Sequence, residues 1–165
     1  MPKRLSEEQV AQYKRDGFVF PIDVFTNLEV ARYRTSLEAV EAAQGGPLKG
    51  PQKSKTYLLY DWYYEMITHP CVLDAVEDLI GPNILVFYGT SWLKPPSGKH
   101  FVSWHQDATY FGLEPAELVT GWLGLSDSTP ATGCVQVLPG TQTLGQIQSH
   151  QGAQSENNLL SSGQR

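Results

Sequence analysis

Two segments near the N-terminus combine a capping signal with hydrophobic residues at helical spacing. Residues 6–9 have the S-x-x-Q form of a capping box, and this form predicts a short helix that ends at Gly17. Residues 26–29 repeat the signal, and Gly45 begins the Gly-Gly-Pro sequence that should end the second helix. One face of that helix is predicted to lie against a core through Val30, Tyr33, Leu37 and Val40.

A third helix is predicted to begin near Pro70 and to end at Gly81, because proline suits the first turn of a helix and glycine its end. Its buried residues should be Val72, Leu73, Val76 and Leu79. The preceding run, residues 57–67 (YLLYDWYYEMI), is too aromatic for a solvated loop. It fits either a short helix or the wall of an apolar pocket, and for residues 57–64 core packing is favoured over the pocket.

After Asn83 the pattern changes to short segments rich in Val, Phe, Trp and Leu, separated by Pro, Gly, Ser and Asp. This pattern predicts strands at about residues 84–93, 101–107, 118–125 and 134–138. Helices followed by strands of antiparallel character indicate an α+β chain or a jelly roll decorated with helices. The stretch from Gln142 onward is polar and lacks periodicity, and we predict a long loop there.

Length and composition narrow the class of protein. The 165 residues, 41% of them hydrophobic, suit a single domain, 1–165. The charge is mildly acidic, with 12 Lys and Arg against 17 Asp and Glu and no basic block, so a nucleic-acid partner is not expected. No segment has the roughly 18 consecutive apolar residues of a membrane span. With two widely spaced cysteines and no leader-like N-terminus, the sequence predicts a cytoplasmic protein without a disulfide framework.

His105 and Asp107 are the residues most suited to metal chemistry. Residues i and i+2 of a strand point to the same face, so the imidazole and the carboxylate would lie side by side. Such a pair supplies two ligands of a 2-His-1-carboxylate triad, whose third ligand is a histidine from elsewhere. A histidine and an aspartate at this spacing occur by chance in about a fifth of such chains, so the motif alone also fits a structural hydrogen bond.

The sequence around the pair resembles a known family. WHQDATYFGL, followed by TGWLGLSDSTPATGCVQVLPGTQ, is similar to the iron(II)- and 2-oxoglutarate-dependent oxygenases of the phytanoyl-CoA dioxygenase family. The upstream SWLKPPSGKHFVSWHQD and, more loosely, EDLIGPNIL share the resemblance. It implies a double-stranded β-helix (jelly roll, cupin-like), with residues 1–82 mainly helical and 83–165 forming the first half of the β-helix core.

The resemblance also implies roles for individual residues. His105 and Asp107 match two of the three iron(II) ligands, and the implied activity is hydroxylation of a small-molecule substrate with 2-oxoglutarate as cosubstrate. Trp122 matches a tryptophan that lines the 2-oxoglutarate pocket, and Thr90 lies where relatives place another residue in contact with the cosubstrate. A core aromatic explains Trp122 equally well. Lys94 is expected to be solvated rather than paired with a carboxylate.

The family's third iron ligand is a histidine well downstream, near an arginine that holds 2-oxoglutarate. By this resemblance both are expected to lie beyond residue 165, so the chain is predicted to be a fragment or a shortened relative of such an oxygenase. His69 precedes a helix, His100 lies at a turn and His150 lies in the polar stretch, so none of them is expected to complete the triad. The alternatives are a catalytically inert fragment or degenerate β-barrel binding module, and a cupin-type metal enzyme of another kind.

Overall fold

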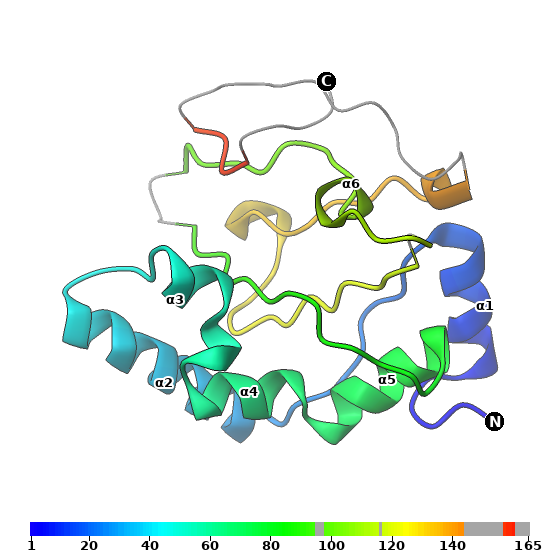
Figure 1. Cartoon of the computed structure of the whole chain (residues 1–165), viewed down its shortest axis with the longest axis horizontal. Coiled ribbons are helices and arrows are strands. Elements are labelled where there is room, and N and C mark those ends of the chain that lie inside the picture. Colours follow the sequence, from blue (N-terminus) through cyan, green and yellow to red (C-terminus); the bar gives the residue numbers. More distant parts are fainter. Residues whose placement is uncertain (95–97, 116, 144–156, 161–165) are drawn as a thin grey trace.

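Helices dominate the first half of the chain, and irregular segments cross above them in the second half (Figure 1). The computed structural model describes residues 1–94, 98–115, 117–143 and 157–160. Its helices are α1 (Glu7–Asp16), α2 (Asn27–Gln44), α3 (Pro51–Ser54), η1 (Thr56–Leu58), α4 (Asp61–Ile67), α5 (Pro70–Ile80), α6 (Ala108–Phe111), η2 (Pro130–Thr132) and η3 (Thr141–Thr143). No helix in these ranges has the length and the apolar run needed to cross a membrane.

Both predicted capping boxes are present. The Ser6 hydroxyl accepts a hydrogen bond from the Gln9 N–H at 3.1 Å, and the Gln9 side chain accepts one from the Ser6 N–H at 2.8 Å. Thr26 and Glu29 repeat this arrangement at the start of α2. Because these bonds satisfy N–H groups that lack a partner within the helix, the sequence predicted both starting points correctly. The helix predicted from Pro70 is confirmed as α5.

The C-terminus of α1 is closed by residues distant in sequence. The Gln142 side-chain amide donates to the carbonyl oxygens of Lys14 and Arg15, at 3.3 and 3.1 Å, so it satisfies free carbonyl groups of the last turn. Gly17 has φ +84° at this point, and a Cβ placed there would lie 2.5 Å from the Gln142 amide oxygen. The left-handed backbone therefore favours glycine at this position, and a larger residue would also have to displace the Gln142 amide.

The aromatic run at residues 57–67, for which the sequence predicts either a short helix or a pocket wall, contributes to η1 and α4. It supplies the centre of the core. Tyr63 and Met66 of α4 are buried against Tyr33 of α2, which is fully buried. Seven partly buried residues pack around them: Phe25, Tyr57, Tyr60, Trp62, Ile67, Leu123 and Leu125. The reading of this run as core packing is confirmed for the residues that belong to this cluster.

The second half of the chain departs from the strand prediction. The structure assigns no β-strand within the described residues, so paired strands at 84–93, 101–107, 118–125 and 134–138 are wrong for those residues. A strand needs a hydrogen-bonded neighbour along its length, and the described residues provide one isolated parallel bridge, between Phe101 and Asn158. Leu123 and Leu125 nevertheless turn inward while Trp122 is exposed, which is the alternation of a half-buried strand. The double-stranded β-helix stays a prediction.

The N-terminus is tied to α5 by one carboxylate. Asp78 accepts hydrogen bonds from the backbone N–H groups of Lys3, Arg4 and Leu5 at 2.7, 2.8 and 2.8 Å. Burial on its own raises the pKa of Asp78, but the three N–H donors together with Lys3 outweigh that effect and hold the pKa below its usual value. Hydrogen bonds to an ionised carboxylate are stronger than those between neutral groups, so this contact fixes the start of the chain.

We predict that Asp78→Asn lowers the free energy of unfolding by about 1 kcal/mol at neutral pH, because it removes charge-assisted hydrogen bonds. Since the pKa is lower in the folded state, the stabilisation is present above the unfolded pKa and is lost as the pH falls through the folded pKa. Denaturant unfolding from about pH 6 to about pH 3 measures the difference, which should shrink toward acid. Asp74→Asn is the control, because Asp74 is also an acidic residue of α5 near Lys3, but its contact is with the ammonium, at 4.0 Å, and not with the backbone N–H groups. An equal effect of both substitutions would contradict the prediction.

Candidate metal site

His105 and Asp107 lie together, as the sequence predicted, but a turn rather than a strand brings them there. The Nε2 atom of His105 is 3.2 Å from Oδ1 of Asp107. Asp107 has helical backbone angles, φ −57° and ψ −38°, and directly precedes α6. The N–H of Tyr110 donates to the Asp107 carbonyl at 3.0 Å and so closes the first turn of that helix. The side chains therefore converge because the chain bends at Asp107, not through the alternation of a pleated strand.

The orientation of the His105 ring is set by a backbone carbonyl. Nδ1 of His105 lies 2.7 Å from the Ser103 oxygen, and since a carbonyl only accepts, Nδ1 must carry the hydrogen. Nε2 is then the nitrogen that faces the Asp107 carboxylate. The hydrogen bond to Asp107 is the largest of the influences that raise the pKa of His105. A positive charge, whether a proton or a metal ion, thus stabilises the contact between Nε2 and Oδ1.

Thr120 holds the other side of the carboxylate. Its hydroxyl donates to Oδ2 of Asp107 at 2.5 Å, while Oδ1 faces His105. The hydrogen bond from His105, followed by that from Thr120, lowers the pKa of Asp107 against the opposing effect of burial. The sequence analysis did not predict a role for Thr120, because its position two residues before Trp122 is a weak signal. Thr120 and Asp107 are 13 positions apart in the sequence, and no local pattern reveals their contact.

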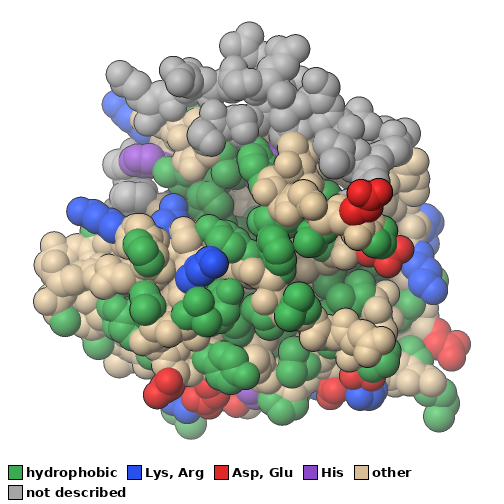
Figure 2. Space-filling model, viewed as in Figure 1, with side chains coloured by type: hydrophobic (Ala, Val, Ile, Leu, Met, Phe, Trp, Pro, Cys, Tyr) green, Lys and Arg blue, Asp and Glu red, His purple; other side chains and the backbone are tan. Residues whose placement is uncertain are grey.

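Aromatic side chains border the pair along α6. The ring of Tyr110 meets the His105 ring edge to face, with centroids 5.8 Å apart. Phe111 packs in turn on Phe87 and Tyr88, at 5.3 and 5.9 Å. Hydrophobic side chains gather over much of the middle of the face shown in Figure 2. Of these aromatic side chains, Tyr110 gives the His105 ring a direct neighbour on the α6 side.

The geometry fits two ligands of one metal ion. Two cis ligands of an octahedral ion, each about 2.1 Å from it, lie about 3 Å apart, close to the observed 3.2 Å between Nε2 and Oδ1. The hydrogen on Nδ1 leaves the Nε2 lone pair to the ion, and a backbone carbonyl is a frequent second partner of metal-binding histidines. Within the described part of the chain, no three His, Cys, Asp or Glu residues gather as a metal site. His150 and Arg165 lie outside the described residues.

Within the described ranges, the two residues expected at the cosubstrate, Trp122 and Thr90, make no hydrogen bond or ring contact with His105 or Asp107. Trp122 is 50% exposed, so the alternative prediction, a core aromatic, does not describe it. Thr90 is half-buried beside Ser91, whose hydroxyl contacts that of the fully buried Thr56 at 3.2 Å. Their roles at the cosubstrate stay predictions.

Other residues considered from the sequence have structural contacts. Nδ1 of His69 accepts the Cys71 N–H at 3.3 Å at the start of α5, and Nε2 lies 3.3 Å from Glu29. This histidine caps a helix and links it to α2, as its place before a helix suggested. The Lys94 side chain is exposed, as predicted, and its ammonium also donates to the Gly133 carbonyl oxygen at 2.5 Å.

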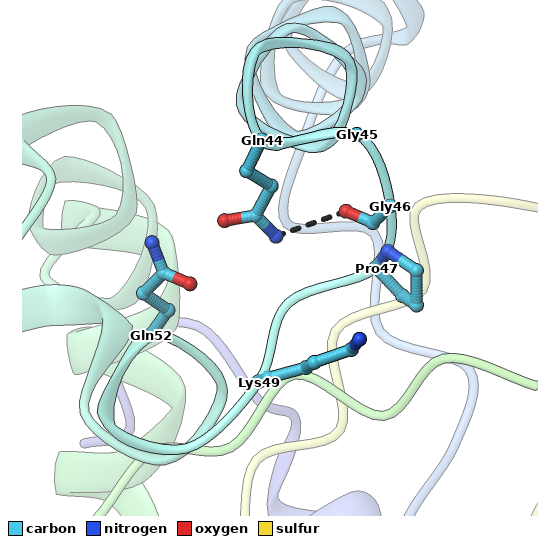
Figure 3. A pocket seen from close by; sticks show the side chains of 6 residues that line it. All are labelled: Gln44, Gly45, Gly46, Pro47, Lys49 and Gln52. Carbon is cyan, nitrogen blue, oxygen red and sulfur yellow. Dashed lines mark hydrogen bonds between the residues drawn. The ribbon is translucent and has the colours of Figure 1, made fainter.

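An open cavity of about 310 Å³ lies at the turn between α2 and α3 (Figure 3). It is lined by Gln44, Gly45, Gly46, Pro47, Lys49 and Gln52, and the Gln44 amide spans part of it by donating to the Gly46 carbonyl at 2.9 Å. None of the candidate metal or cosubstrate residues lines it. We assign it no part in the site.

Comparison with known proteins agrees with the resemblance of the motifs. Residues 13–161 match the family model described as Phytanoyl-CoA dioxygenase (PhyH). The peroxisomal phytanoyl-CoA dioxygenases of Bos taurus and Homo sapiens are 28% and 27% identical over 88% of this chain and 50% of their own length. Ectoine dioxygenase of Bordetella parapertussis is 25% identical over 83% of this chain and 49% of its own length. No solved structure matches.

Because the family model covers most of the chain, including His105, Asp107 and Thr120, the protein belongs to the phytanoyl-CoA dioxygenase family. The chain spans about half the length of the curated relatives it matches. The family identification from the WHQD context is therefore confirmed, and the activity of the whole protein is a matter for proposal.

We predict that Thr120→Val raises the pKa of Asp107, because the lost hydroxyl stabilised the ionised carboxylate. Following the Asp107 carboxyl carbon by NMR through an acid titration measures the change. Thr120→Ser keeps the hydroxyl and should leave the pKa close to that of the unchanged protein. If the valine and serine variants titrate alike, Thr120 does not hold the carboxylate.

Proposed function

We propose that this chain carries the His-x-Asp portion of the iron(II) site of a 2-oxoglutarate-dependent dioxygenase, with His105 and Asp107 as two protein ligands of the iron. The observation that carries the proposal is the 3.2 Å contact between Nε2 and Oδ1, with Nδ1 already bound to the Ser103 carbonyl. Membership in the family supports it, because the resemblance places two iron ligands at these positions.

The protein's part in this function is to hold and orient. Iron(II), when bound, would supply the activation of oxygen that is coupled to oxidation of 2-oxoglutarate. His105 and Asp107 would fix two coordination positions, Ser103 would keep the imidazole in the tautomer that presents Nε2, and Thr120 would keep Oδ1 turned toward the ion. Tyr110 shields one side of the His105 ring and limits its rotation. We assign Trp122 and Thr90 to the cosubstrate, following the family positions.

We propose hydroxylation of a small molecule as the reaction. Relatives named for phytanoyl-CoA and for ectoine show that the family includes enzymes for very different substrates. The Tyr110 ring beside His105 favours a substrate or substrate portion without charge next to the metal. For location, we propose the cytoplasm, as the sequence suggested.

One observation favours a second candidate, a binding module of this family without catalysis. In the ranges that the structure describes, the metal-binding side chains gather as a pair and not as a triad. Two ligands bind a divalent ion more weakly than three, since each ligand adds to the affinity. The two candidates therefore differ in whether iron binds one to one and together with 2-oxoglutarate.

An anaerobic iron(II) titration tests the proposed function. We expect a saturable one-to-one signal, with a visible charge-transfer band when 2-oxoglutarate is added, and we expect His105→Ala and Asp107→Ala each to abolish it. His100→Ala is the matched control, since it removes a histidine outside the pair and should leave the band in place. A folded protein without a band, or a band that survives His105→Ala, would reject this site in favour of the binding module.

A further inference from the structure

Residues 157–160 lie alongside the residues that come just before His105 and Asp107. Phe101 donates through its N–H to the Asn157 carbonyl at 3.0 Å, and Leu159 donates to the Phe101 carbonyl at 2.9 Å. These bonds form the parallel bridge between Phe101 and Asn158. The segment belongs to the polar stretch for which the sequence predicted only a loop. It is thereby docked four residues before His105.

The Asn158 side chain extends this contact to Ser103. Its amide oxygen accepts the Ser103 N–H at 3.2 Å, and its amide nitrogen donates to the Ser103 hydroxyl at 3.0 Å. The same amide oxygen accepts the Leu160 N–H at 3.2 Å. Because N–H groups only donate, these two bonds fix which end of the amide faces the backbone. One side chain therefore holds Ser103 by its backbone and by its hydroxyl.

Ser103 is also the residue that orients His105. Its carbonyl accepts the hydrogen from Nδ1 at 2.7 Å, and this bond holds the ring with Nε2 facing Asp107. The direction of the carbonyl depends on the Ser103 backbone, because one pair of dihedral angles joins the N–H and carbonyl groups of a residue. Asn158 binds the N–H of Ser103, so it restricts the backbone next to that carbonyl.

We propose that Asn158 is a positioning residue of the metal site, which acts on the His105 imidazole through Ser103. This inference rests on the proposed function where it concerns metal affinity. The part that concerns ring orientation stands without a metal. Partners in the second coordination layer change metal affinity by about 10- to 100-fold, and since Asn158 acts through one intermediate residue, we expect the lower end of that range.

The test uses the full chain and follows two readouts. The first is the tautomer of His105 in the metal-free protein, read from the ring nitrogen signals in ¹⁵N NMR at a pH at which the imidazole is neutral. The second is the dissociation constant for iron(II) measured anaerobically. Asn158→Ala should convert the single Nδ1–H form of His105 into a mixture and should weaken iron(II) binding about 10-fold.

Two variants provide matched controls. Asn157→Ala changes the neighbouring asparagine, whose contact with Phe101 is made by the backbone carbonyl, so both readouts should be unchanged. Asn158→Asp keeps the accepting oxygen and should retain the tautomer. If Asn158→Ala does not fold, Asn158→Ser, whose side chain is too short to reach both N–H groups, takes its place.

The outcomes separate the inference from the proposed function. If the alanine or serine variant of Asn158 loses thermal stability but keeps the His105 tautomer and the iron(II) affinity of the unchanged chain, Asn158 is merely structural and the inference is overturned. If the tautomer becomes mixed in that variant while no chain, including the unchanged one, binds iron(II), positioning by Asn158 stands and the proposed function fails.

Discussion

Burial of Tyr33 against Tyr63 and Met66 is the contact on which the other elements depend. It sets α4 on α2 and creates the apolar surface on which Leu123 and Leu125 pack from a segment some 60 residues further along the chain. Aromatic residues bury the largest areas, and burial contributes roughly 25 cal/mol for each Å² of apolar surface, so this cluster has enough driving force to fix a segment that lacks ladder hydrogen bonds. Thr120 lies on that segment, and its hydroxyl reaches Asp107.

His105 and Asp107 are thus held from two directions by neighbouring groups. Thr120 acts on the carboxylate from the segment that packs on the core, and Ser103 acts on the imidazole from the residues that Asn158 clamps. With both partners fixed, the pair keeps its negative carboxylate and its imidazole close together, and a cation between them is stabilised without further rearrangement. Such preorganisation is what a catalytic metal site needs, and it serves equally in a site that only binds.

Local signals predicted the helices well because their ends depend on neighbours in sequence. The capping boxes at Ser6 and Thr26 satisfy N–H groups three residues away, so the four residues concerned contain all of the information. The strand prediction failed in the described residues for the opposite reason. An alternating pattern such as that around Leu123 shows which side chains turn inward, but it does not provide the neighbouring chain that makes a strand.

The sequence by itself determined the family, the helix boundaries of α1, α2 and α5, and the identity of His105 and Asp107 as adjacent metal-competent groups, since each rests on residues close together in the chain. Only the tertiary structure decided that a turn at Asp107 brings the pair together, that Thr120 binds Asp107 and Asn158 binds Ser103, and that Trp122 stands outside the core. These contacts join residues 13 to 55 positions apart. Their closure depends on the packing of the whole chain, which no local pattern of residue types records.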